Sequence, residues 1–256
     1  MRTTLAAVSI AAFSLVQPAA ARADGSFTVK PTSISLTARA TSQLVAITNV
    51  STRQLRFEIR ATKWVQDDRG ELTLTPAGNQ ITFAPSLVTL APGASRNVRV
   101  GAPASAFGNS EGTYRLFVEE LPDTSSPRGP GTVAFRLEIG VPIFLAPSRP
   151  TSSAQITGVG FDQGRLVTRL RNTGNVHMIV SGVKIQGTDG GGAVKYDRTL
   201  DGWYVLAGDT RVFEQQITPS DCAGARTMAV TVDVQGTLLK EQTAIPAGAC
   251  NGPAGR

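Results

Sequence analysis

The segment GTVAFRLEIGVPIFL, residues 131–145, decides the architecture that this sequence predicts. Its apolar residues occupy alternate positions: Val133, Phe135, Leu137, Ile139, Val141, Ile143 and Leu145. Strict alternation of this kind predicts a β-strand with one apolar face. At about 3.3 Å per residue the strand would be roughly 40 Å long, whereas strands in globular proteins usually contain about five or six residues.

The other face of this predicted strand is unlike a solvent-exposed surface, because Gly140, Pro142 and Phe144 share it with Arg136 and Glu138. A long apolar strand at the edge of a sheet promotes aggregation, and proteins normally avoid it. One reason to keep such a strand is that another chain pairs with it by β-augmentation. The alternative is a strand that completes its own sandwich and then runs into a linker. Alternation alone does not separate these two interpretations.

The residues before this segment predict a β-sandwich. Short runs of β-branched and aromatic residues are separated by Gly, Pro, Asn and Asp, and no stretch shows a sustained helical period. The expected strands cover residues 27–36, 43–48, 55–65, 71–75, 80–84, 87–90, 95–100 and 112–121. Pro31 interrupts the first of them, which fits a sheet edge or a bulge better than the middle of a sheet. About eight short strands in roughly 120 residues are typical of a sandwich.

A proline-bounded link, residues 147–150, leads to a second set of predicted strands. These cover residues 154–161, 165–171, 178–186, 194–199, 205–206, 210–218 and 229–235. Their spacing predicts a second, smaller sandwich. The sequence therefore predicts an all-β chain with one domain at residues 24–146 and another at residues 147–256, whose tail after Cys250 is expected to be disordered.

The first 23 residues have the pattern of a secretory signal peptide. Arg2 gives a positive start, residues 5–16 form a short apolar run, and Ala21-Arg22-Ala23 fits an A-x-A cleavage site. The apolar run is too short to span a bilayer comfortably, and no later segment approaches the length of a membrane-spanning helix. We therefore expect an exported, soluble mature chain that begins at Asp24.

Charge and cysteine usage exclude several function classes. The net charge of +6 falls to +4 when Arg2 and Arg22 leave, and the remaining basic residues are scattered, so neither nucleic acid nor a membrane surface is indicated as a partner. In an exported chain, Cys222 and Cys250 predict a structural disulfide. With no C-x-x-C motif and His177 as the single histidine, we expect no metal site, no cofactor and no Ser-His-Asp catalysis.

Several short motifs resemble those of the periplasmic pilus (fimbrial) assembly chaperones. They are Ile47-Thr48-Asn49 with Ser51; Trp64 with Gln66 and Gly70; Leu90 with Pro92-Gly93; Val98-Arg99-Val100; Tyr114-Arg115-Leu116 leading to Glu119-Glu120-Leu121-Pro122; and Val141-Pro142-Ile143-Phe144 ahead of Pro147. No single motif is specific, but their order and spacing extend over about 120 residues of the first domain. The second domain resembles the family only in position, expected fold and its late cysteine pair.

The resemblance implies two immunoglobulin-like domains in an L shape, located in the periplasm. It also implies that a pilus or spore-coat-U-like subunit binds along the long last strand of the first domain. Such subunits are sandwiches without their final strand, and the chaperone inserts alternate side chains into the open groove by donor-strand complementation. The donors in this sequence would be Val133, Phe135, Leu137 and Ile139. The subunit would then pass to an outer-membrane usher, and the resemblance implies no nucleotide.

The sequence departs from the family at the anchor for the subunit's C-terminal carboxylate. Many members use two basic residues there, but the matching positions in this chain are Ser33 and Pro142. The P-x-F pattern of residues 142–144 is similar to the spore-coat-U-type (archaic) branch. The candidate anchors, best first, are Arg99 and Arg115, then Lys63 and Lys30.

A second departure concerns the interdomain salt bridge that family members use. Glu120 matches its acid, but Ala146 stands at the position of the basic partner, which leaves Arg149 as a substitute. Trp203 and Tyr204 are expected in the core or at the domain interface.

The leading interpretation is a periplasmic chaperone with a subunit client. The alternative is an exported structural or adhesive β-sandwich protein of the cell surface. An exported hydrolase is disfavoured because the chain has a single histidine.

Overall fold

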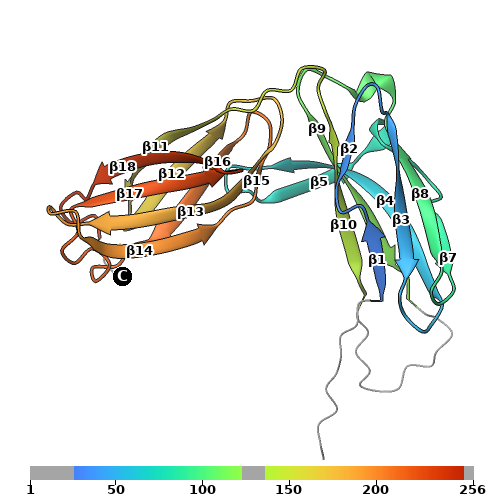
Figure 1. The fold of residues 1–256 in the computed structure, drawn as a ribbon, viewed down its shortest axis with the longest axis horizontal. Coiled ribbons are helices and arrows are strands. Elements are labelled where there is room, and N and C mark those ends of the chain that lie inside the picture. The colour runs from blue at the N-terminus through green and yellow to red at the C-terminus, as the bar shows by residue number, and fades with distance from the viewer. Residues whose placement is uncertain (1–25, 123–135, 251–256) are drawn as a thin grey trace, which may run out of the picture.

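Two β-sandwiches set at a pronounced angle make up the chain, as Figure 1 shows. The computed structural model describes residues 26–122 and 136–250. The expected signal peptide, the predicted donors Val133 and Phe135, and the C-terminal tail therefore lie outside the described residues. The predicted all-β class with two sandwiches is confirmed. In the part of the chain that is described, no helix has the length and apolar character needed to cross a membrane.

The first sandwich consists of two facing sheets. One has the strand order β1 (Phe27–Lys30), β3 (Ser42–Asn49), β8 (Ser95–Gly101), β6 (Thr82–Ala84). The other has the order β2 (Ile34–Leu36), β10 (Glu138–Leu145), β9 (Gly112–Glu120), β4 (Leu55–Gln66), β5 (Leu72–Pro76), with β7 (Leu87–Leu90) also paired to β4. Two short 3-10 helices, η1 (Gly78–Gln80) and η2 (Ala104–Ala106), lie in the connections.

The core of this sandwich follows from alternation along its strands. In β4 the side chains of Leu55, Phe57 and Ile59 are buried between the sheets, while their neighbours in sequence point out. Side chains of the facing β3 and β8, such as Ile47 and Val98, are fully buried in the same cluster. Burial of each such side chain contributes roughly 1.5–3 kcal/mol.

The single strand predicted for residues 27–36 is two strands that belong to different sheets. β1 pairs antiparallel with β3, whereas β2 pairs parallel with β10. Pro31 lies in the connection, and because proline has no N–H to donate, it cannot continue the ladder of β1. This change of sheet brings β2 beside the end of β10. The strand predicted for residues 80–84 is also shorter, because Gln80 belongs to η1.

The second sandwich follows the link at residues 147–150. One sheet has the order β11 (Ala154–Asp162), β12 (Arg165–Asn172), β16 (Thr210–Gln216). The other has the order β14 (Val194–Asp201), β13 (Met178–Thr188), β17 (Thr227–Val234), β18 (Thr237–Ala244), with β15 (Tyr204–Val205) also paired to β13. A separate core forms between these sheets, with Leu170, Val183 and Val230 fully buried.

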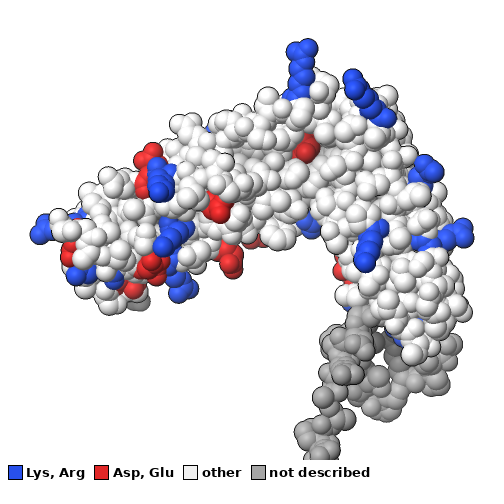
Figure 2. All heavy atoms as spheres, viewed as in Figure 1, with Lys and Arg blue, Asp and Glu red and all other residues white. Residues whose placement is uncertain are grey.

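Charged side chains are spread over the surface rather than gathered. Figure 2 shows acidic and basic side chains interspersed on the second domain, while the Lys and Arg side chains of the first domain stand apart from one another. No single basic patch is visible on this face, in keeping with the scattered positions of these residues in the sequence.

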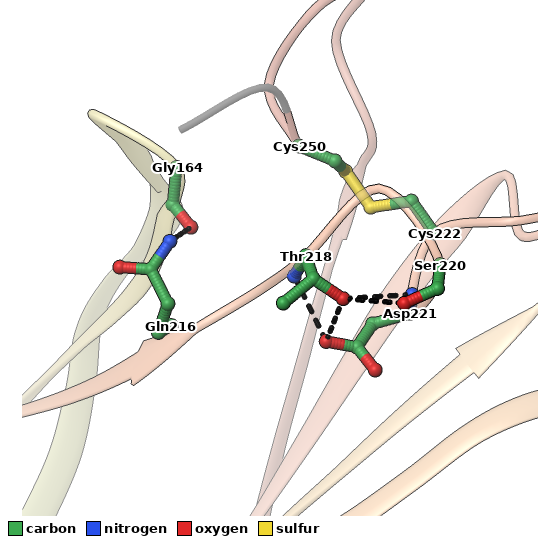
Figure 3. Close-up of a disulfide and its surroundings, with 7 residues drawn as sticks. All are labelled: Gly164, Gln216, Thr218, Ser220, Asp221, Cys222 and Cys250. Carbon is green, nitrogen blue, oxygen red and sulfur yellow. Dashed lines mark hydrogen bonds between the residues drawn. A yellow bond between two sulfur atoms is a disulfide. The ribbon is translucent and has the colours of Figure 1, made fainter. Parts of the chain in front are cut away.

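The predicted disulfide between Cys222 and Cys250 is confirmed (Figure 3). It joins the turn after β16 to the segment after β18, with a Cα–Cα separation of 6.3 Å, and Cys250 is buried against the second core. The turn is ordered by Asp221, whose carboxylate accepts hydrogen bonds from the Thr218 N–H at 2.8 Å and the Thr218 hydroxyl at 2.7 Å. The bond thus fixes the last described residues to the body of the domain.

Replacing both cysteines by serine should destabilise the second domain. The bridged residues are 28 apart in sequence, and a loop of that size predicts a loss of about 3.5 kcal/mol when the cross-link is removed. Urea unfolding of the full chain, with and without the double substitution, measures the loss. An unchanged midpoint would contradict a stabilising role for the bond.

Candidate functional site

β10 has a partner along its whole length on one side only. Its eight residues pair antiparallel with β9, but β2 covers only Ile143–Leu145 on the other side. Among the described residues no strand pairs with positions 138–142 on that side. The backbone groups there stand at an open sheet edge, to which an extended segment of another chain can add.

The apolar face of β10 runs out of the core of its own sandwich. Ile143 and Leu145 are fully buried, and Val141 is 1% exposed. Ile139 is only partly buried against the same core, and Leu137, just before the strand, is 38% exposed. Burial therefore falls toward residue 137 while the apolar pattern continues. An apolar row that leaves its core at an open edge is suited to pairing with another chain.

The strand predicted over residues 131–145 begins at Glu138 in the described part of the chain, so the prediction was too long at residues 136–137. β9, the partner on this side, ends at Glu120, which faces Leu137, so residue 136 has no partner in β9. Of the four predicted donors, Ile139 lies in β10 and Leu137 one residue before it, while Val133 and Phe135 lie outside the described residues. The Leu137 carbonyl still accepts a 3.0 Å hydrogen bond from the Glu120 N–H.

The outer face of this sheet, opposite the first core, carries a row of charged and aromatic side chains. The register places three sets of residues side by side on β4, β9 and β10: Glu58 with Glu119 and Glu138, Arg60 with Phe117 and Gly140, and Thr62 with Arg115 and Pro142. Arg60 lies 4.1 Å above the centre of the Phe117 ring and binds Glu138 at 2.5 Å. Arg136 binds Glu119 at 3.1 Å. Arginines therefore neutralise two acids of the first set, Glu119 and Glu138.

Arg115 differs from Arg60 because the described residues offer it no carboxylate. Its guanidinium lies 4.6 Å from the centre of the Trp64 ring, and the Nε atom is buried without a hydrogen-bond partner. Burial lowers the pKa of the Arg115 guanidinium, and nearby Tyr204 acts in the opposite direction. A half-buried arginine retains its charge at neutral pH. Arg115 is thus a cation available to an anionic ligand beside β10.

The other predicted anchors are not brought together with β10. Arg99 lies on β8, in the facing sheet, and donates a 3.1 Å hydrogen bond to the Ser42 hydroxyl. Lys30 and Lys63 are exposed. Ser33 is exposed in the connection between β1 and β2. Of the predicted basic residues, the structure places Arg115 on the strand next to β10.

A small aromatic cluster joins the two domains at the outer face of the first sandwich. Trp64, Phe144 and Leu206 are buried together, with Tyr204 packed against them. The Trp64 ring centre is 6.0 Å from that of Phe144 and 5.4 Å from that of Tyr204. Trp64 and Phe144 therefore belong to the interdomain contact rather than to the core of the first sandwich. Trp203 stays half exposed beside Tyr204.

Hydrogen bonds on one flank of this cluster fix the domains to each other. Glu111, just before β9, accepts hydrogen bonds from the His177 N–H at 2.8 Å and lies 2.7 Å from His177 Nδ1. The His177 ring stacks on Phe144 with a centroid distance of 3.8 Å. Asn175 accepts the Glu111 N–H at its carbonyl and donates its side-chain amide to the carbonyl oxygens of Asn109 and Arg149. His177 therefore lies at the hinge between the two domains.

The turn between β4 and β5 makes a second interdomain contact. The Val212 N–H donates a 2.7 Å hydrogen bond to the Asp68 carbonyl. The Arg211 guanidinium occupies the place where a side chain at Gly70 would begin, since a Cβ there would lie only 0.8 Å from Arg211 Nη1. Figure 1 shows β5 extending from the first domain toward the second. The joint is therefore held on two sides of the aromatic cluster.

Glu120 does not form the interdomain salt bridge that its motif suggested. Its carboxylate pairs with Arg53 and accepts a 2.6 Å hydrogen bond from the Ser26 hydroxyl, and all three residues belong to the first domain. Arg149 takes part in the joint through its backbone carbonyl. The suggestion was wrong because Glu120 is on the core-facing parity of β9, and its side chain is buried inside the first sandwich.

Glu111, Asn175 and Arg211 had no signature in the sequence. Glu111 and His177 are 66 residues apart, so no local pattern joins them. The available signal was chemical: Glu111 and Asn175 lie in polar segments that border the predicted ends of strands, where loops of two domains can meet.

Comparison with known proteins matches the first domain to a family. Residues 26–151 match the family model described as pili and flagellar-assembly chaperone, PapD N-terminal domain. No curated protein matches the chain.

Solved structures share the fold of both domains. The chaperone–tip adhesion subunit complex CsuC–CsuE from archaic chaperone-usher Csu pili of Acinetobacter baumannii aligns with 18% identity and a TM-score of 0.58, over 84% of this chain and 97% of that one. The CupB2 chaperone of Pseudomonas aeruginosa aligns with 13% identity and a TM-score of 0.53, over 85% and 99%. The complex of SafA pilin with the SafB chaperone of Salmonella enterica aligns with 12% identity and a TM-score of 0.52, over 86% and 96%. At these identities the likeness concerns the fold.

Proposed function

We propose that the chain, whose residues 26–151 match the family model of the pili and flagellar-assembly chaperones, stabilises pilus or spore-coat-U-like subunits by donor-strand complementation. In this proposal the chain is a non-enzymatic chaperone of pilus assembly that works in the periplasm, as the name of the similar periplasmic chaperone SfaE suggests. The P-x-F pattern of residues 142–144 supports a place in the spore-coat-U-type (archaic) branch. Delivery of the subunit to an outer-membrane usher completes the proposal.

The observation that carries the proposal is the open edge of β10 together with its emerging apolar row. Leu137 is exposed and Ile139 only partly buried, although both continue the parity of Val141 and Ile143. A sandwich that lacks its last strand offers a groove of alternate pockets and a free strand edge. Pairing with β10 would fill the pockets with the donor side chains and give the free strand edge a backbone partner.

The energetics favour such a complex without any chemical step. Each donor side chain that passes from water into a subunit groove contributes roughly 1.5–3 kcal/mol. The proposed donors are Leu137 and Ile139, continued by Val133 and Phe135 through the alternation of the sequence. Backbone pairing sets the register, because a slip of one residue would turn the apolar row away from the groove. Another strand of equal pattern can replace β10, which provides a route of release at the usher.

Arg115 is the proposed anchor for the subunit's C-terminal carboxylate. It lies directly opposite Pro142 in the register, and it has no carboxylate partner among the described residues. Its half-buried position supports this role, because an ion pair is stronger when it is partly shielded from water, and a guanidinium can hold a carboxylate bidentately. Arg99 remains the weaker proposal, since it lies on the facing sheet.

Affinity capture tests the function. The full chain, tagged after Arg256 and produced in the periplasm of its own host, should co-purify with a small exported β-protein in equal amounts. After release, that protein should become sensitive to protease or aggregate, because its groove is again open to water. A tagged chain that remains alone while pili or coat are assembled would contradict the proposal and favour a structural protein of the cell surface.

A further inference from the structure

Positions 138, 140 and 142 of β10 lie on its outer face. Of these three residues, Gly140 alone has no side chain. A Cβ at this position would lie 3.0 Å from Arg115 Cδ and 3.0 Å from Phe117 Cε1. Contacts this short are rare for real side chains. Gly140 is not among the glycines with positive φ, so its backbone conformation does not call for glycine. The side chains of Arg115 and Phe117 occupy the space that a side chain at position 140 would need.

The Phe117 ring cannot easily move away from the space beside Gly140. Its side chain is buried, with Arg60 placed over the ring at 4.1 Å, and Arg60 is in turn bound to Glu138. An added methyl group at position 140 would therefore press mainly on the flexible stem of Arg115. Because Cδ lies one bond from Nε, a displacement there changes the position of the guanidinium over the Trp64 ring.

We propose that Gly140 is a positioning residue, which lets the stem of Arg115 lie across β10 and holds its guanidinium between Trp64 and the open strand edge. The proposal rests on the proposed role of Arg115 as the carboxylate anchor. Glycine at this point has a second effect, because no side chain projects from the outer face of β10 beside the Arg115 guanidinium. A subunit strand that pairs with β10 can then bring its terminal carboxylate close to Arg115.

Gly140→Ala tests the proposal with two synthetic peptides of alternating apolar residues, identical except that one ends in a free carboxylate and the other in an amide. The wild-type chain should bind the free acid about tenfold more tightly, the size of one charge-assisted interaction. Arg115→Met should remove this preference, and so should Gly140→Ala. Affinity for the amide should stay the same in all three proteins.

Gly158→Ala is the matched control. Gly158 is also a strand residue, in β11, and nothing lies within 4 Å of its added Cβ, so the substitution should leave both affinities unchanged. If Gly140→Ala folds poorly, the same change in a Phe117→Leu background removes the ring contact and keeps the contact with Arg115. Phe117→Leu alone should retain the preference for the acid, and the double variant should lose it.

The outcomes separate this inference from the proposed function. A preference that Arg115→Met removes and Gly140→Ala retains overturns the role of Gly140 and leaves the anchor intact. A wild-type chain without preference overturns both. The free protein gives an independent reading, because the Trp64 ring should shift the NMR resonance of the Arg115 Nε–H group. Gly140→Ala should abolish that ring-current shift, and a retained shift would contradict the positioning role.

Discussion

Replacing Leu137 with glutamate should abolish the complex with a subunit while the free chain stays folded. Leu137 is 38% exposed and lies outside β10, so a polar side chain there disturbs little of the first core. In the complex the same side chain would enter an apolar groove, where an unpaired carboxylate costs several kcal/mol. Affinity should therefore fall by at least about 100-fold, since each 1.4 kcal/mol is a factor of ten.

Co-purification and thermal unfolding measure the two halves of this prediction. Leu87→Glu is a matched control, because Leu87 is 61% exposed on β7, which pairs with β4 and lies away from the open edge of β10. It should leave the complex intact, and both variants should unfold within about 0.5 kcal/mol of the wild type, as is usual for surface substitutions. A complex that survives Leu137→Glu would remove Leu137 from the donor row.

Ile139 is the less informative position for this experiment. It packs against the first core as well as lying on the open part of β10. A charge at this site would weaken the sandwich and the complex together, and the loss of binding could not be assigned to the donor strand.

The sequence predicted which side chains of β10 face the core, but not which strands pair with it. Alternation at residues 139–145 correctly indicated which side chains enter the core, because a strand turns each successive side chain to the opposite face. Whether the strand has a free edge depends on β2, which reaches β10 only because the chain changes sheet after Pro31. That event joins segments more than a hundred residues apart, and no local pattern encodes it.

The outer face shows the same limit. Trp64 and Phe144 lie on the parity opposite the core, and both are buried there by Leu206 and Tyr204 of the second domain, a contact that alternation along the two strands does not identify. Glu120 shows the converse, since a motif suggested an interdomain role and the side chain is enclosed in its own domain with Arg53. The lack of space for a side chain at Gly140 could not be predicted from the sequence either, because it depends on where the side chains of Arg115 and Phe117 lie.

Trp64→Ala should have the largest effect on stability and should loosen the joint. Trp64 is fully buried between the domains, in contact with Phe144 and Tyr204 and beneath the Arg115 guanidinium. Truncation of a buried tryptophan costs about 3–5 kcal/mol, which lowers Tm by roughly 10 °C for a chain of this size. Part of this loss is offset, because the buried indole N–H has no hydrogen-bond partner in the described structure and its removal relieves a desolvation cost.

Three variants separate loss of packing from loss of the interdomain contact. Trp64→Phe retains a ring without the indole N–H, so it should cost less than about 1.5 kcal/mol. Trp203→Ala removes the half-exposed neighbour of Tyr204 and should be nearly neutral, which makes it the matched control for Trp64→Ala. Calorimetry should show the two domains of Trp64→Ala unfolding in separate transitions, and small-angle scattering should show a wider range of domain orientations. If Trp64→Ala keeps a single transition and the wild-type scattering profile, the remaining contacts are enough to hold the joint, among them those of Glu111 with His177 and of Asp68 with Val212, because these hydrogen bonds do not involve the indole.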